Sequence, residues 1–263
     1  MMSLRKWTGL LFVLICPGLV FAGLGELSAS AVESSRPRLA LTSPLVFSSG
    51  YSYSFRNGAC GISDGSDFDA VRSAFETWTG QPGLSLRAVE IDQKGKFVPG
   101  RMNYQNDISW ICPTADDPNP WKHALNLPDE MLAVVMVWTE PRTHRVLERD
   151  LYFNDVTICW RTESDGAEIG GYFVEHIALH EIGHLFGLPD VYDPGQPGWE
   201  EWMGSENRAL TMYGYSSWQD ETVVLHPADV AAMALLHSAG TPEPGSFGLW
   251  GLAAGLFWVI SRR

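Results

Sequence analysis

The chain is short of basic residues. In its 263 residues, 18 lysines and arginines stand against 31 aspartates and glutamates, which gives a formal net charge of −13. A surplus of negative charge repels phosphate backbones and anionic lipid headgroups. We therefore expect neither a nucleic acid nor an anionic membrane surface as a partner. The apolar content of 45% is that of a globular chain, and the length suits one domain with appendages or two small domains.

Cysteine is scarce as well, with four in the chain, and none has the spacing of a zinc-cysteine site. Cys16 falls in the N-terminal segment described next, which leaves Cys60, Cys112 and Cys159. An exported chain permits a disulfide, but three thiols cannot all pair within one molecule. Their spacing alone therefore leaves each of them structural or free.

The N-terminus lacks an apolar run of membrane-spanning length. Its basic start is followed by a shorter apolar stretch from Leu10 to Phe21. This stretch is too short to span a bilayer comfortably, so residues 1–31 are predicted to be a secretory signal. Cleavage could follow Ala22 or Ala31, and an uncleaved anchor is the alternative. Residues 32–44, rich in Ser, Pro and Arg, are predicted to be a loose linker.

Hydrophobic periodicity predicts an α/β domain after this linker. The last two helices are expected to begin near Tyr172 and at Pro227. The helix that begins near Tyr172 carries a polar motif at 180–190. Because this helix follows the strands, the site is expected on the helix after the sheet. The predicted strands are 51–55, 84–91, 108–112, 132–138 and 146–153, and the first predicted helix is 66–78.

The polar motif is the stretch HEIGHLFGLPD at 180–190. His180 and His184 are four residues apart, so on a helix both imidazoles reach one ion. Glu181 lies beside that ion, where it can take a proton from a metal-activated water. Gly187 permits a sharp turn that returns Asp190 as a third ligand. Three protein ligands and one open position are typical of catalytic zinc.

Each of these assignments has a plainer alternative. The helix could simply be amphipathic, with half-buried histidines. Asp190 could be a turn carboxylate that accepts backbone hydrogen bonds, in which case Asp193 or His226 would have to supply the ligand. His176 lies one turn, about 5.4 Å, before His180, so it is expected to be a wall residue and not a ligand.

Four segments, in this order, resemble the metzincin zinc proteases, and the matrixin branch most closely. AVRSAFETW at 70–78 resembles the first matrixin helix with its terminal Trp, and RDLYFND at 149–155 resembles the strand before the active-site helix. HEIGHLFGLPD at 180–190 resembles the zinc motif. LTMYGYSS at 210–217 resembles the Met-turn, whose Met212 would lie beneath the metal. The resemblance covers residues 45–240.

The resemblance implies a zincin-like α/β (α+β) catalytic domain over 45–240. A twisted, mixed five-stranded sheet would pack on the active-site helix and the first helix, with the Met-turn and a C-terminal helix below. A peptide substrate would lie antiparallel to an exposed edge strand at 132–138. In the family's strand order the ends of the strands 108–112 and 149–155 are neighbours. The resemblance therefore implies a Cys112–Cys159 disulfide and leaves Cys60 free.

The implied function is an exported zinc-dependent endopeptidase, in which Glu181 is the general base and two histidines and Asp190 hold Zn²⁺. The alternatives are a non-catalytic matrix or adhesion module with a vestigial zinc site, and an immune-inhibitor-A-like protease, which GLPDVYD at 187–193 resembles. An intact Glu181 argues against the module. Tyr213 and Tyr215 are candidates for binding a transition-state oxyanion or for packing. Trp199, Trp202 and Trp218 are candidates for shaping the pocket or, alternatively, for packing in the core.

The chain also departs from the family. Most members have histidine where Asp190 stands, although some branches use Asp, and no recognisable prodomain fits before residue 45. The loop 113–130 has a single histidine, His123, so a second, structural zinc is not expected. Its acidic residues make calcium a second candidate cation, with a solvated acidic loop as the alternative. These residues are Asp116, Asp117, Asp129 and Glu130.

The C-terminal segment 241–263 runs from TPEPG through an apolar stretch at 247–260 to two arginines. It resembles the bacterial PEP-CTERM sorting signal, which implies an exosortase-type enzyme as a processing partner. A plain C-terminal anchor is the alternative. We therefore expect a periplasmic, cell-surface or extracellular protein, transiently anchored, that contacts the membrane only through its two terminal segments.

Overall fold

The computed structural model of the chain describes residues 47–93, 95–140, 143, 145–163, 170–200, 203 and 206–238, together with the backbone of residues 10–15. The two predicted cleavage sites, the linker 32–44, the sorting segment 241–263 and Trp202 lie outside them. No helix in the described ranges is long and apolar enough to cross a membrane.

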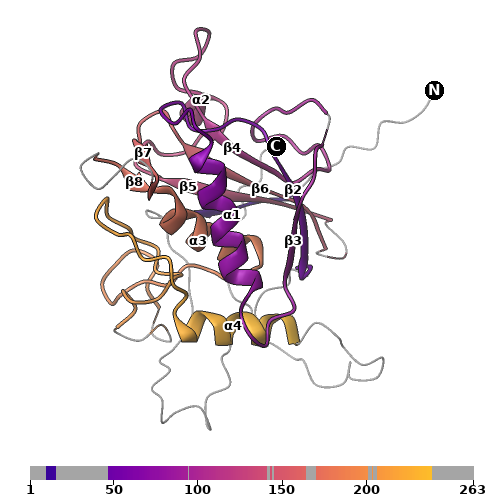
Figure 1. Ribbon diagram of the computed structural model, residues 1–263, viewed down its shortest axis with the longest axis vertical. Coiled ribbons are helices and arrows are strands. Elements are labelled where there is room, and N and C mark those ends of the chain that lie inside the picture. The colour runs from indigo at the N-terminus through magenta and orange to yellow at the C-terminus, as the bar shows by residue number, and fades with distance from the viewer. Residues whose placement is uncertain are drawn as a thin grey trace, which may run out of the picture.

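A mixed sheet forms the centre of the molecule (Figure 1). As the sequence predicts, it contains five strands of the domain, and a sixth from the N-terminal segment is described below. β5 and β6 are antiparallel, and the β6–β4, β4–β2 and β2–β3 pairs are parallel. In spatial order the five are β5 (Ala133–Thr139), β6 (Val146–Asn154), β4 (Asp107–Ile111), β2 (Gly50–Phe55) and β3 (Arg87–Glu90).

In the full chain the edge strand at 132–138, expected to be open in the domain 45–240, is covered. β1 (Leu10–Ile15) pairs antiparallel with β5, from Leu10 opposite Thr139 to Ile15 opposite Val134. An edge strand presents unpaired backbone groups, and a second extended strand satisfies them. β1 lies within the segment predicted to be a secretory signal, and that role stays a prediction.

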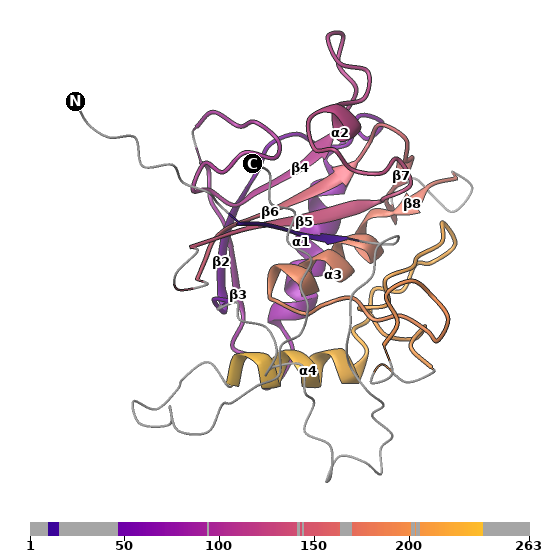
Figure 2. The same cartoon turned by 180° about the vertical axis from the view of Figure 1, so that it is seen from behind.

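Helices α1 (Ser66–Thr79) and α3 (Val174–Leu185) pack together on one face of the sheet (Figures 1 and 2). The fully buried indole of Trp78, at the end of α1, donates a hydrogen bond from Nε1 to the carbonyl of Leu179 in α3 (2.8 Å). Side chains from alternate positions of β5 and β6 meet these helices. The other alternate positions, Tyr152 among them, form a smaller core on the opposite face with Trp121.

The shorter elements complete the domain. α4 (Pro227–Ser238) lies across the end of α1, and α2 (Pro120–His123) is a single turn inside the loop 113–130. β7 (Trp160–Arg161) pairs in parallel with β8 (Tyr172–Phe173), which leads directly into α3. The site helix therefore begins two residues later than the sequence suggests, because Tyr172 and Phe173 are still extended.

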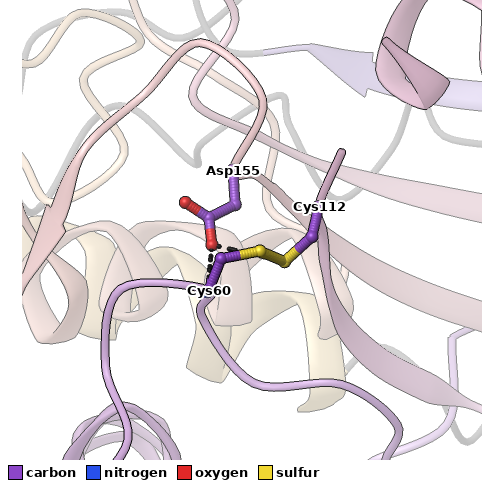
Figure 3. A group of neighbouring side chains, drawn as sticks. All are labelled: Cys60, Cys112 and Asp155. Carbon is purple, nitrogen blue, oxygen red and sulfur yellow. Dashed lines mark hydrogen bonds between the residues drawn. A yellow bond between two sulfur atoms is a disulfide. The ribbon is translucent and has the colours of Figure 1, made fainter. Parts of the chain in front are cut away.

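The expected disulfide is wrong. Cys60 is bonded to Cys112 (Figure 3). Cys159 is free and exposed. Cys60 lies in the loop after β2 and Cys112 directly follows β4, and their Cα atoms are 6.2 Å apart, an ordinary spacing for a disulfide. Asp155, at the end of β6, accepts a hydrogen bond from the backbone N–H of Cys60 (2.5 Å).

Candidate metal centre

Helix α3 carries three polar side chains into the interior of the domain. His180 is 4% exposed, and Glu181 and His184 are fully buried. Charged and polar side chains are rarely this deeply buried unless they have partners. All three lie on a helix that is buried from Ile177 to Leu185, so neighbouring side chains restrict their movement.

The helix ends in a turn that fits the predicted role of Gly187. This glycine has φ +106°, in the left-handed region that only glycine enters cheaply. Its N–H donates to the carbonyl of His184 (3.0 Å), and the N–H of Leu188 donates to the carbonyl of Gly183 (2.9 Å). This pair of bonds is a Schellman motif, which reverses the chain after a helix. The reversal brings Asp190 back to the histidines.

One oxygen of Asp190 meets both imidazoles. Oδ1 is 3.0 Å from Nε2 of His180 and 3.2 Å from Nε2 of His184. The three groups offer ligand atoms that all lie within 4.8 Å of one another, and Asp190 is 3% exposed. The structure thus brings together the three residues that the sequence names as ligands.

The two alternative third ligands are engaged elsewhere. Asp193 accepts hydrogen bonds from the N–H of Asn207 (3.0 Å) and the hydroxyl of Tyr213 (3.1 Å). The Nδ1 atom of His226 accepts one from the N–H of Ala228 (3.2 Å). Neither residue belongs to the cluster of potential ligands around the two helix histidines.

Backbone carbonyls fix the tautomer of both histidines. Nδ1 of His180 lies 2.8 Å from the carbonyl of Thr211, and Nδ1 of His184 lies 2.7 Å from that of Leu188. A carbonyl oxygen can only accept, so both Nδ1 atoms carry hydrogen. Each neutral ring then presents the lone pair of Nε2 towards Asp190. Such backbone partners are typical of metal-binding histidines.

This arrangement fits a divalent cation. Without one, Nε2 of each histidine could approach Asp190 only as a donor, which would require two buried imidazolium ions beside one carboxylate. Burying uncompensated charge in this way is costly. Among the described residues, Nε2 of His184 has no hydrogen bond of acceptable geometry although it is fully buried. Two imidazole nitrogens and a carboxylate oxygen form a donor set that suits zinc.

The electrostatics of Asp190 agree with a site built for positive charge. Burial by itself raises the pKa of this carboxyl, but in the cation-free site positive charge and hydrogen bonds from the imidazoles of His184 and His180, in their protonated form, outweigh burial. Together they hold the pKa of Asp190 well below its usual range. The residue is therefore a carboxylate at neutral pH.

Met212 packs against the site helix at Gly183, and its expected place beneath a metal stays a prediction. It is 1% exposed, and its carbonyl accepts a hydrogen bond from the N–H of Val191 (2.8 Å), just after Asp190. A Cβ atom built on Gly183 would lie 2.2 Å from the Met212 sulfur. The methionine thus joins the site helix to the turn that carries Asp190.

A cavity of about 510 Å³ opens beside His180. His176 lines it, as expected for a wall residue, with Nδ1 donating to the carbonyl of Thr222 (2.7 Å). Tyr213 and Tyr215 line it as well, whereas Trp218 is 55% exposed and is not among the lining residues. Trp199 packs against the core.

Two of the acidic side chains of the loop 113–130, those of Asp117 and Asp129, bond within the loop. Asp117 accepts hydrogen bonds from the N–H of Asn119 (3.0 Å) and from the ring of His123 (2.7 Å), which lowers its pKa. Asp129 accepts one from the side-chain amide of Asn119 (3.0 Å). A role for calcium stays a prediction.

The sequence did not single out Tyr192. Its side chain is fully buried, and its hydroxyl donates to Oδ2 of Asp190 (3.0 Å). The signal available was its position two residues after the candidate ligand, next to a turn whose shape the sequence does not specify.

Comparison of the sequence with protein-family models finds no match, and a search of curated proteins finds no significant relative.

Proposed function

We propose that the protein is a zinc-dependent endopeptidase with a metzincin-type catalytic domain. The observation that carries the proposal is the meeting of three buried acceptor atoms, Nε2 of His180, Nε2 of His184 and Oδ1 of Asp190. Zinc held by these atoms would polarise the scissile carbonyl and make water more acidic. The order of the sheet, site helix and Met212 turn supports the metzincin assignment.

Glu181 supplies the proton transfer in this proposal. It follows the first ligand on α3 and is fully buried, so its carboxylate acts within the site and away from bulk water. It takes a proton from the attacking water and delivers it to the amine that leaves the cleaved peptide. A site that only binds has no need of this carboxylate.

The surrounding residues orient the substrate. The cavity beside His180 has room for a substrate side chain, and Tyr213 and Tyr215 on its wall are the candidates for contacting the oxyanion of the transition state. An extended peptide would pair with β5. Because β1 covers that edge, we infer that loss of the N-terminal segment, as expected of a secretory signal, uncovers it. Export and C-terminal sorting belong to the same proposal.

The test compares the zinc-loaded protein with its Glu181→Gln variant on a mixed peptide library. Glu175→Gln is the matched control, because Glu175 is on the same helix and bonds to Ser73 instead of facing the site (2.6 Å). We expect Glu181→Gln to bind zinc but to lose about 100-fold or more in cleavage rate, and Glu175→Gln to cleave normally. Stoichiometric zinc with no cleavage by any form would favour the non-catalytic module. Absence of zinc binding would refute the site.

A further inference from the structure

The two oxygens of Asp190 have separate partners. Oδ1 faces the two histidines, while Oδ2 accepts a hydrogen bond from the hydroxyl of Tyr192 (3.0 Å). A carboxylate without such a partner can ligate a cation through one oxygen or through both. Here one oxygen is occupied by a donor that belongs to the protein.

The ring of Tyr192 has little freedom to move away. Its backbone N–H lies 3.2 Å from the sulfur of Met203, and its carbonyl accepts a hydrogen bond from the side-chain amide of Asn207 (2.8 Å). The ring packs edge-on against Tyr215, with centroids 5.5 Å apart. On another side, a Cβ built on Gly214 would lie 2.4 Å from the ring. The hydroxyl is therefore held in place before any cation binds.

We propose that Tyr192 is a positioning residue that makes Asp190 a one-oxygen ligand and thereby sets the affinity of the site for its metal. The inference rests on the metal site of the proposed function. Residues that bond to ligands orient them, and their loss typically weakens metal binding by about 10–100-fold. Tyr192 reaches the cation only through Asp190, so its effect should depend on that carboxylate.

The chain contains a matched control. On β6, the hydroxyl of Tyr152 donates to Oδ2 of Asp150 (2.5 Å), with the same separation of two residues and the same complete burial. This pair lies on the sheet face opposite α3. If the Tyr192 bond only stabilises the fold, Tyr192→Phe and Tyr152→Phe should behave alike.

The experiment measures zinc affinity by competition with a chromophoric chelator, and the visible spectrum of the cobalt-loaded protein, in the full chain. We expect Tyr192→Phe to bind zinc about 10–100-fold more weakly and to shift the cobalt spectrum. Tyr152→Phe should remain within about twofold of the parent and keep its spectrum. Unchanged affinity and spectrum in Tyr192→Phe would overturn the proposal.

Dependence on Asp190 is tested by combining variants. In an Asp190→Asn background, Tyr192→Phe should cost no more than about a further twofold, because the group it positions is gone. An equal loss in both backgrounds would mean that Tyr192 acts on the fold in general. The infrared difference spectrum of the zinc-loaded and zinc-free parent protein gives an answer even if Tyr192→Phe does not fold. A one-oxygen ligand separates the two carboxylate stretches widely, and a narrow, two-oxygen separation would contradict the proposal.

These outcomes are distinct from failure of the proposed activity. A parent protein that binds zinc and cleaves nothing removes the peptidase function but leaves the role of Tyr192 open to the same measurements. A parent protein that binds neither zinc nor cobalt overturns both.

Discussion

The sulfur of Met212 lies against the Cα of Gly183, so close that a Cβ built on Gly183 would be 2.2 Å from it. Gly183 stands between Glu181 and His184 on the site helix, and the indole of Trp78 is also within 3.3 Å of the same built atom. A glycine in a helix costs about 0.5–1 kcal/mol relative to alanine. Here the close approach of Met212 explains why a glycine stands at this position of the helix.

Replacing Gly183 by alanine should therefore destabilise the protein, although alanine favours helices. We expect a loss of about 1–3 kcal/mol in the free energy of unfolding, because the methyl group displaces Met212 or tilts α3. Urea unfolding measures it. Gly61→Ala is the control, since nothing lies within 4 Å of a Cβ built there. Equal stability of the two variants would show that Met212 yields without cost.

The Cys60–Cys112 disulfide gives a second prediction. The bonded residues are 52 positions apart, and closing a loop of that length stabilises the folded state by roughly 4 kcal/mol through the entropy of the unfolded chain. The Cys60→Ser, Cys112→Ser double variant should lose about 2–5 kcal/mol in unfolding experiments without reductant. Cys159→Ser should change little. Peptide mapping that finds Cys112 joined to Cys159 would contradict the structure.

Glu148 makes stability depend on pH. This β6 residue is 1% exposed and accepts hydrogen bonds from the N–H groups of Asn103 (2.8 Å) and Tyr104. Burial raises its pKa from 4.5 to about 7, and these hydrogen bonds offset only part of that rise. The folded protein thus keeps a proton on Glu148 that the unfolded chain releases at lower pH.

Linkage then gives the sign. The contribution of Glu148 is fully present below about pH 4.5 and is lost as pH rises towards about 7, by up to roughly 3 kcal/mol. Urea unfolding at intervals from about pH 4 to about pH 8 should show the free energy of unfolding falling between the unfolded-state pKa of Glu148, 4.5, and its folded-state pKa, about 7. Glu148→Gln should flatten the fall, while Glu76→Gln, at an exposed position of α1, should not. Parallel curves for the parent and Glu148→Gln would rule out this origin.

Local geometry explains what the sequence could predict. Helical spacing alone puts His180 and His184 on one face, and a glycine three residues later signals the turn that returns Asp190. The apolar runs likewise locate the strands within a few residues. The Cys60 pairing could not be predicted in this way, because it depends on which loop meets the end of β4 in space.

Two further features depend on tertiary contacts. An apolar stretch such as Leu10–Ile15 has the same composition in a signal and in a strand, so only pairing with β5 distinguishes β1. The bond from Tyr192 to Asp190 requires a ring to fold back across a turn, and that path exists because Gly214 has no side chain. Neither contact leaves a periodic pattern in the sequence.

Gly214 therefore links the turn that follows Met212 to Asp190, the proposed third ligand. Its N–H donates to the carbonyl of Val191 (2.9 Å), which holds the strand segments together. A Cβ built on Gly214 would lie 2.4 Å from a ring carbon of Tyr192 and 2.9 Å from its hydroxyl oxygen. An alanine there has to push the ring, and the hydroxyl with it, away from Asp190.

Gly214→Ala should consequently weaken zinc binding by about tenfold or more, besides lowering the free energy of unfolding by roughly 1–3 kcal/mol. Chelator competition measures the first effect and urea unfolding the second. Gly170→Ala, at a position with nothing within 4 Å of the built Cβ, is the control for both. Loss of stability with unchanged zinc affinity would show that the ring can shift while Asp190 stays in place. Loss of both would mean that the packing of one glycine against Tyr192 controls the geometry of the metal ligand.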